Sequence, residues 1–219
     1  MRVLGWIEDL APELIAIGAD VPPAPRWDQD WFPRLDAAAA YAIVRMSRPA
    51  RIVEVGSGHS TRFMARAVRD GSLGTRITAI DPEPRASLAG LDLRCLRQPV
   101  QTCDVGLFQS LAPGDILFID SSHQLKAGSD VEFLLHQVLP RLASGVRIHF
   151  HDVFLPDEYP VQWAWRRYNE QAAVAELIGA GYALEFSSHT ASAGRLNGVL
   201  GRLPLVPGAM ETSLWLTKH

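Results

Sequence analysis

The feature that most constrains this chain is a glycine turn that joins a predicted strand to a predicted helix. Residues 52–55, Ile-Val-Glu-Val, are apolar apart from one acidic residue, which is typical of a strand buried in a parallel sheet. Gly56 and Gly58 follow, and they allow a tight turn because neither carries a Cβ. Ser60 or Thr61 can then cap a helix whose apolar residues share one face. A strand, a glycine turn and a helix N-terminus in this order predict a binding site for a nucleotide-like ligand.

The rest of the chain alternates between predicted strands and helices. The strands are expected at residues 52–55, 76–80, 91–96, 115–120, 146–150, 182–186 and 213–217. Helices are expected at residues 6–19 (broken or short because of Pro12), 36–46 (with Asp36 as a possible cap) and 130–142, and residues 163–178 are expected to contain one or two helices. This alternation predicts right-handed crossovers and an α/β fold with a Rossmann-like, doubly wound, mostly parallel sheet. Residues 187–212 show no helical pattern, which favours an antiparallel last strand.

Length and composition limit the classes of protein that remain. A chain of 219 residues is expected to form a single domain over 1–219, with 1–35 as a helical and extended N-terminal arm. The net charge of −3 gives no support for a nucleic-acid or anionic-membrane partner. No apolar stretch approaches the length of about 20 residues that spans a bilayer. We therefore expect a cytoplasmic protein whose two cysteines are free thiols.

Two aromatic segments have no obvious place in the periodic pattern. For Trp27, Trp31 and Phe32 we favour packing of the arm against the domain, and the alternative is that they cover a substrate pocket. The second segment, residues 154–168, follows the fifth predicted strand and contains Trp163. Because that strand ends beside the ligand crevice of a parallel sheet, this segment is predicted to form one wall of the pocket.

Carboxylates end several of the predicted strands. Asp81 ends the second strand, where a carboxylate can accept hydrogen bonds from both hydroxyls of a ribose. The alternative role for Asp81 is to cap a turn before Pro82. Asp104 follows the third strand and is placed near an adenine by position alone. These residues and the glycine turn make a predicted cofactor site.

A second polar cluster follows the fourth and fifth predicted strands. Asp120-Ser121-Ser122-His123 ends the fourth strand, and His149-Phe150-His151-Asp152 ends the fifth. Because neighbouring parallel strands end at one edge of the sheet, both groups are expected to border one pocket. Carboxylates and imidazoles there can bind a divalent metal or act as general bases. For His149 we favour a packing role in the core.

The glycine turn, with an acidic residue two positions before its first glycine, resembles motif I of the class I S-adenosylmethionine (SAM)-dependent methyltransferases. The sequence also resembles a bacterial branch of these enzymes, which includes macrocin-type and cation-dependent O-methyltransferases. This second resemblance lies in residues 114–123 and 138–146 and in the His151-Asp152 pair that follows them. The similarity covers roughly residues 36–154 and a terminal strand at 213–216.

The resemblance implies specific site residues. The cofactor would be SAM, with Glu54 facing its amino group and Asp81 its ribose; the cofactor-binding set is Glu54, Gly56, Ser57, Gly58, Ser60, Thr61, Asp81 and Asp104. In cation-dependent relatives, the metal is held at positions that match Asp120, His151 and Asp152. Imidazole at His151 departs from that pattern, and magnesium prefers oxygen ligands. In those cation-dependent relatives, a lysine three residues after the fourth-strand aspartate occupies the position that matches His123 here.

The leading hypothesis is a SAM-dependent methyltransferase that methylates a hydroxyl of a small molecule or sugar, with or without a divalent metal ion. His123 is the candidate base, His151 the alternative base or a ligand, and Asp120 and Asp152 orient the acceptor. The competing hypotheses are a nucleotide-dependent oxidoreductase and a non-catalytic cofactor-binding or scaffold protein on the same fold. The expected partner is a small-molecule acceptor, and a homodimer is left open.

Overall fold

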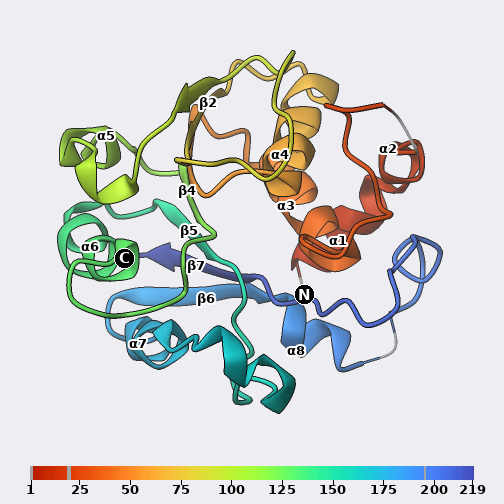
Figure 1. Ribbon diagram of the computed structural model, residues 1–219. Helices are drawn as coiled ribbons and strands as arrows, with labels where there is room; N and C mark the ends of the chain where they lie inside the picture. The colour runs from red at the N-terminus through yellow and green to blue at the C-terminus, as the bar shows by residue number, and fades with distance from the viewer. Residues whose placement is uncertain (1, 19–20, 195) are drawn as a thin grey trace.

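A seven-stranded mixed sheet lies between two layers of helices (Figure 1). The computed structural model describes residues 2–18, 21–194 and 196–219. The strands are β1 (Arg51–Val55), β2 (Arg76–Ile80), β3 (Arg94–Leu96), β4 (Ile116–Ile119), β5 (Arg147–Phe150), β6 (Tyr182–Ser187) and β7 (Leu214–Lys218). Their order across the sheet is β3-β2-β1-β4-β5-β7-β6. The first five strands are parallel, and β7 runs antiparallel to both β5 and β6. The predicted Rossmann-like fold with an antiparallel last strand is confirmed.

Helices cover both faces of the sheet, and each face has its own hydrophobic core. One layer contains α1 (Arg2–Asp9), α2 (Ala11–Ile15), α3 (Arg34–Ser47), α4 (His59–Asp70) and the short α8 (Ser188–Ser192); the other contains α5 (Val105–Gln109), α6 (Asp130–Phe133) and α7 (Glu170–Leu177). Side chains of successive strand residues point to opposite faces. Accordingly, Ile52 packs in the core beneath α3 and α4, while Val53 packs in the core on the other side.

Several predicted elements have different bounds in the structure. The helix expected at 130–142 begins as α6 but continues as a π-helical turn, η2 (Leu134–Val138), and a 3₁₀ turn, η3 (Leu139–Arg141). Pro140 lies in η3, and proline removes a backbone donor and prevents regular α-helix at this point. The region 163–178, expected to contain one or two helices, contains the 3₁₀ segment η4 (Val161–Arg166), which begins two residues earlier, and α7. A further 3₁₀ turn, η1 (Val100–Thr102), precedes α5.

Asp36 does not cap α3. The helix begins at Arg34, after Pro33, and the Asp36 carboxylate is fully buried inside the first turn. It accepts hydrogen bonds from the backbone N–H groups of Thr212 (3.0 and 3.1 Å) and Ser213 (2.9 Å). These two N–H groups immediately precede β7, and buried backbone donors need a partner. Asp36 therefore fastens the start of the last strand to α3.

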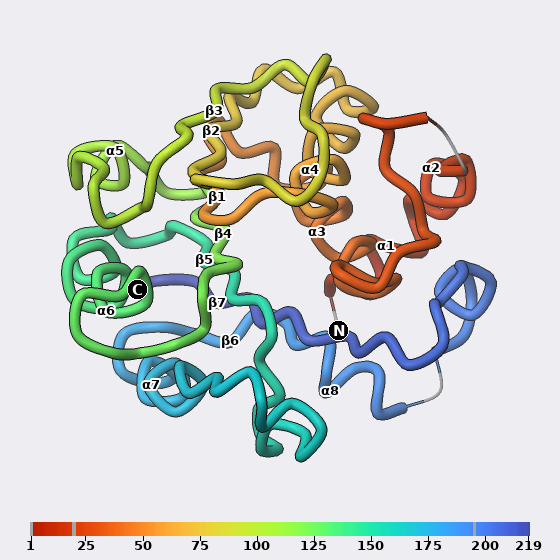
Figure 2. Tube along the Cα trace, viewed as in Figure 1, coloured from red at the N-terminus to blue at the C-terminus, as the bar shows by residue number. Residues whose placement is uncertain are grey.

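The chain between β6 and β7 crosses to the N-terminal helices (Figure 2). There the Glu8 carboxylate accepts a hydrogen bond from the backbone N–H of Val199 at 2.9 Å, and Arg34 pairs with Glu211 at 2.9 Å. Trp27 is buried with its ring centroid 4.9 Å from that of Phe63, which agrees with a packing role. Across the described ranges, every helix is too short or too polar to cross a bilayer.

Candidate functional site

A cavity of about 730 Å³ opens at the carboxyl ends of the central strands. Its wall includes Gly56 and Ser57 after β1, Asp81 after β2, residues 120–123 after β4, and residues 151–152 after β5. The carboxyl ends of parallel strands meet at one edge of a sheet, so residues that are far apart in the chain share this opening. The cavity therefore joins the two predicted sites.

The glycine turn holds the ends of three strands together. Gly56 has φ +78°, and a Cβ at this position would overlap the carbonyl oxygen of Asp120. The Gly56 N–H donates to the carbonyl of Ile80 at 3.0 Å, and the Asp120 N–H donates to the carbonyl of Val55 at 2.8 Å. Both the positive φ and the close approach require glycine here.

Asp81 shapes the turn and also borders the cavity. Its Oδ2 accepts hydrogen bonds from the backbone N–H of Ser57 (2.7 Å) and from the Ser57 hydroxyl (3.0 Å), while Oδ1 accepts from the backbone N–H of Glu83 (2.8 Å). A carboxylate has about four acceptor positions, and these three donors leave Asp81 with about one for a ligand hydroxyl. Gly56, Ser57 and Asp81 are thus the predicted cofactor residues that the cavity wall contains.

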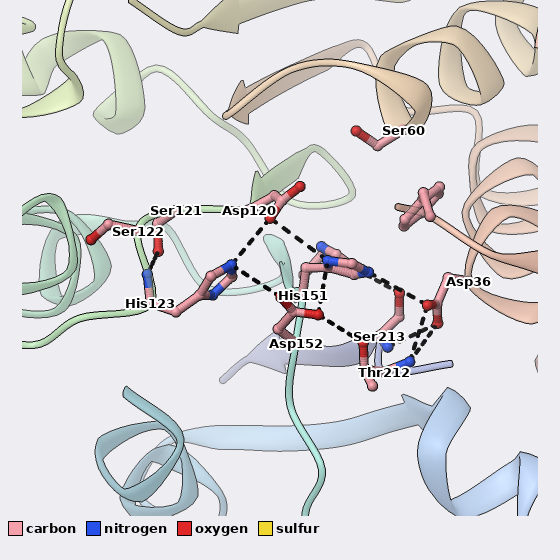
Figure 3. A network of polar contacts seen from close by, with 12 residues as sticks. Asp36, Ser60, Asp120, Ser121, Ser122, His123, His151, Asp152, Thr212 and Ser213 are labelled. Atoms are coloured by element: carbon pink, nitrogen blue, oxygen red, sulfur yellow. Dashed lines mark hydrogen bonds and ion pairs between the residues drawn. The ribbon is translucent and has the colours of Figure 1, made fainter. Parts of the chain in front are cut away.

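The structure separates the other predicted cofactor residues from the cavity. Glu54 is fully buried, and its two oxygens accept hydrogen bonds from the hydroxyls of Ser60 and Thr61, both at 2.6 Å. Figure 3 shows Ser60 apart from the polar network below it. Thr61 also accepts from the N–H of Gly58, which precedes α4. Glu54 therefore secures the start of α4, and its carboxylate faces these two hydroxyls and lies outside the cavity wall.

Asp104, the remaining predicted cofactor residue, also lies outside the cavity wall. It precedes α5, and its Oδ1 accepts a hydrogen bond from the backbone N–H of Gly106 at 2.9 Å. An aspartate at this position satisfies a free N–H group of the first helical turn. Its observed role is to cap a helix.

Glu54 gives the protein a pH-dependent stability that can be measured. Burial raises the pKa of Glu54 to about 8, although its two hydroxyl donors act in the opposite direction. A carboxyl whose pKa is raised on folding stabilises the fold below its unfolded pKa, and this stabilisation is lost as pH rises through the folded value. We expect the free energy of unfolding to fall by on the order of 3–5 kcal/mol between pH 5 and 9.

Denaturant titrations across this pH range test the expectation, with Glu54→Gln as the matched variant. The amide mimics the protonated carboxyl and does not titrate, so the variant should show little of the decline in stability that the wild-type protein shows between about pH 5 and 8. An equal decline in both proteins would assign the effect to another group.

The four polar residues after β4 and β5 converge into one network (Figure 3). His123 Nε2 lies 3.3 Å from Asp120 Oδ1 and 3.5 Å from Asp152 Oδ2. His151 Nδ1 lies 3.6 Å from the same Asp120 oxygen and 3.5 Å from Asp152 Oδ1. Two imidazoles therefore bridge two carboxylates at the cavity wall.

Two further carboxylates lie beside the outer nitrogens of these histidines, and no sequence pattern predicts either contact. Glu170, the first residue of α7, lies 2.5 Å from His123 Nδ1 and is buried. Asp36 Oδ2 lies 3.5 Å from His151 Nε2. Glu170 sits in an ordinary helical stretch, and Asp36 has the appearance of a cap, so no local pattern marks them. The complete network contains four carboxylates and two imidazoles.

The network favours protonated histidines. Burial alone would lower the pKa of His123, but Glu170, Asp120 and Asp152 raise it well above its usual 6.5. Burial would also lower the pKa of His151, but Asp152 and Asp120 raise it well above its usual value. Burial would raise the pKa of Asp120, and the two histidines reverse that effect and hold it far below its usual range. The expected base His123 is therefore already protonated, with both ring nitrogens facing carboxylates.

Two residues of the network have backbone conformations that side chains rarely adopt. His123 has φ +58° and Asp152 has φ +54°. Each conformation costs on the order of 1–2 kcal/mol and persists only where surrounding contacts enforce it. Here the contacts are those of the network itself, together with the Thr212 hydroxyl that donates to Asp152 Oδ1 at 3.2 Å. Such enforced strain is concentrated at functional sites in proteins.

The far side of the cavity is aromatic. Trp163, Arg166 and Tyr168, from the segment after β5, belong to its wall, as does Trp31 of the N-terminal arm. The Tyr168 ring centroid lies 4.5 Å from that of His123. The segment predicted to form a pocket wall thus borders the cavity. The earlier aromatic group divides, because Trp27 and Phe32 are buried in the core while Trp31 is half exposed beside the cavity.

Comparison with known proteins gives a family match for the central part of the chain. Residues 53–153 match the family model of a methyltransferase domain. No curated protein sequence matches the chain. The matched residues run from β1 to just past β5, so they contain the glycine turn, Asp81 and residues 120–123 and 151–152 of the cavity wall, while the aromatic part of the wall lies outside the match.

Solved structures share the fold. An S-adenosylhomocysteine (SAH)-bound methyltransferase from Podospora anserina, PaMTH1, is similar with a TM-score of 0.54 at 17% identity, over 100% of this chain and 88% of that one. The O-methyltransferase TomG from Streptomyces achromogenes, in complex with SAM, gives a TM-score of 0.50 at 14% identity, over 100% and 90%. A branched-chain polyamine synthase from Thermus thermophilus gives 0.52 at 13% identity, over 96% of this chain and 64% of that one. At these identities the likeness establishes the fold.

Proposed function

We propose that this chain is a class I SAM-dependent methyltransferase and that it methylates a hydroxyl oxygen of a small molecule or sugar. The observation that carries the proposal is the Asp120 carboxylate. It belongs to the cavity wall, its side chain is 37% exposed, and its backbone touches the glycine turn. A carboxylate in that position can receive an acceptor hydroxyl beside the cofactor.

The cavity residues after β1 and β2 fit SAM. When bound, SAM supplies an electrophilic methyl group on a positively charged sulfur. Gly56 and Ser57 belong to the cavity wall, and the Asp81 carboxylate beside them can accept a further hydrogen bond from a ribose hydroxyl. With both histidines protonated, the network of four carboxylates keeps a net negative charge, which favours a cationic ligand in the same cavity.

Asp120 is proposed to position the acceptor and to take its proton. The acceptor hydroxyl donates a hydrogen bond to the exposed carboxylate, which directs an oxygen lone pair toward the cofactor side of the cavity. As the oxygen–carbon bond forms and the carbon–sulfur bond breaks, the hydroxyl proton passes to Asp120. A carboxylate of low basicity suffices, because an oxygen that gains a methyl group while still protonated is a strong acid.

His123 and His151 act as positioning residues in this mechanism. Their N–H groups fix the carboxylates of Asp120 and Asp152, and Glu170 and Asp36 fix the imidazoles in turn. The contact between His123 and Glu170 is a charge-assisted hydrogen bond, and the other contacts are ion pairs at 3.3–3.6 Å. Together they restrict the orientations of these side chains. This assignment replaces the base role expected for His123, whose two nitrogens are both engaged.

The residues expected to bind a metal do not fit one in this arrangement. The His151 imidazole occupies the space between the Asp120 and Asp152 carboxylates, where it supplies the balancing positive charge itself. Within residues 2–18, 21–194 and 196–219, no group of three His, Cys, Asp or Glu side chains is arranged to hold an ion. We derive no catalytic step through a metal.

Calorimetric titration with SAM, SAH and NADH tests the cofactor assignment. SAM and SAH should bind, and NADH should not. Asp81→Ala should weaken SAM binding by about 1–3 kcal/mol, because the variant loses a charged acceptor and loosens Ser57. Asp92→Ala, an exposed carboxylate outside this cavity, should bind normally. Unchanged affinity in a folded Asp81→Ala protein would overturn the placement of the ribose.

The reaction class is tested by SAH release in the presence of hydroxylated small molecules. Activity should survive treatment with a chelator, since the network balances its charge with imidazolium groups. Loss of activity with chelator and its recovery with added magnesium would instead assign a metal to Asp120, His151 and Asp152. Methylation of amines but not of hydroxyls would overturn the proposed acceptor class.

A further inference from the structure

We propose that Arg166 binds a carboxylate of the methyl acceptor, so that the acceptor is a hydroxy acid with its anionic end on the segment after β5. This inference rests on the proposed function and names the class of its substrate. Arg166 ends η4 and belongs to the cavity wall together with Trp163 and Tyr168.

Aromatic rings surround the Arg166 guanidinium. Its Cζ lies 4.2 Å from the ring centroid of Trp163, 5.2 Å from that of Trp165 and 5.4 Å from that of Tyr168. Rings hold a guanidinium in place and remove water from its faces, while its N–H edges keep their need for acceptors. The group is therefore rigid and only partly solvated.

The donors of Arg166 exceed the acceptors that the protein offers. A guanidinium carries five N–H donors. Among the described residues, the acceptor that receives one of them is the Tyr168 hydroxyl, 3.0 Å from Nη1. The Nε atom is buried without a hydrogen-bond partner, and no described carboxylate lies within ion-pair distance of this arginine. A desolvated donor without an acceptor is costly, and a bound ligand can supply the acceptor.

A carboxylate matches these donors. The planar fork of arginine receives the two oxygens of a carboxylate in parallel hydrogen bonds. The charge of the cavity sets the orientation of such a ligand, because the carboxylate-rich network around Asp120 would repel a second anion. Tyr168 lies between Arg166 and His123, in contact with both. The anionic end therefore belongs at Arg166 and the hydroxyl end at Asp120.

Calorimetric titration of the SAH-saturated protein with benzoate and with its neutral analogue benzamide tests the inference. Benzoate should bind the wild-type protein measurably more tightly than benzamide. Arg166→Gln should weaken benzoate binding about tenfold or more and leave benzamide unchanged. Arg166→Lys keeps a cation over the rings and should give an intermediate loss. The matched control is Arg167→Gln, an exposed neighbour outside the cavity wall, which should bind like wild type.

The outcomes separate the inference from the function on which it rests. Failure of the wild-type protein to bind SAH would overturn the proposed function. Normal SAH binding with equal affinity for benzoate and benzamide, or with no effect of Arg166→Gln, would overturn the inference alone. So would a loss confined to Lys126→Gln or Arg85→Gln, two other cations of the cavity wall, or a loss of SAH affinity in Arg166→Gln. Phenyl phosphate is a third probe, which distinguishes a carboxylate site from a phosphate site. If it binds more tightly than benzoate, the group recognised by Arg166 is a phosphate.

Discussion

Replacing Gly56 with alanine is expected to abolish SAH binding and to destabilise the fold. The new Cβ would overlap the carbonyl oxygen of Asp120, and it would also impose a side chain on a backbone with φ +78°. The two costs together should reduce the free energy of unfolding by about 3 kcal/mol or more. Relief of the overlap requires the glycine turn to move away from β4, and the cavity wall at Ser57 and Asp120 would move with it.

A matched glycine separates these two costs. Gly179 has φ +85°, similar to that of Gly56, but a Cβ there would meet no atom within 4 Å. Gly179→Ala should therefore lose only the backbone term, about 1–2 kcal/mol, and should bind SAH normally. Chemical denaturation and calorimetry of the two variants measure both effects. Equal destabilisation of the two proteins would mean that the turn at Gly56 accommodates a side chain.

The fold was predictable because its signals are local and agree with one another. The apolar runs of β1 and β4, the glycine after β1 and the alternation with helices each predict the parallel sheet. The predicted helix at 130–142 was less accurate, since its apolar stripe is the same in α-helical and π-helical turns. The hydrophobic pattern indicates which residues are buried, whereas Pro140 determines how this helical segment ends.

Only the site residues that follow the ends of strands could be predicted from the sequence. Asp81, Asp120, His123, His151 and Asp152 directly follow strands, so topology alone brings them to one edge. Glu54 and Thr61 lie beside that edge, yet the pleat and the first turn of α4 direct them into the interior. Asp36 and Glu170 enter the network through tertiary packing of α3 and α7, which no sequence spacing encodes.

The largest expected effect on catalysis is that of Asp120→Asn. The amide preserves the shape of the side chain and the backbone contact with Gly56, so the protein should fold, and SAM affinity should fall only modestly because three carboxylates of the network remain. The variant lacks the proton acceptor and no longer balances the imidazolium groups of His123 and His151. Loss of a positioned proton acceptor reduces catalytic rates by about 10²–10⁴-fold. We expect the rate of SAH formation, measured with an acceptor that the wild-type protein methylates, to fall by at least about 10²-fold.

The activities of Asp120→Asn and His123→Asn together distinguish the proton acceptor from the positioning residue. If Asp120 takes the proton and His123 only positions it, the aspartate variant should lose more activity, and the histidine variant should retain part of it with SAM affinity unchanged. If His123 were the base, the order of the two losses would be reversed. Activity of Asp120→Asn within threefold of wild type, in a protein that binds SAM normally, would remove Asp120 from the mechanism. Asp92→Asn serves as the control for loss of a carboxylate elsewhere on the surface.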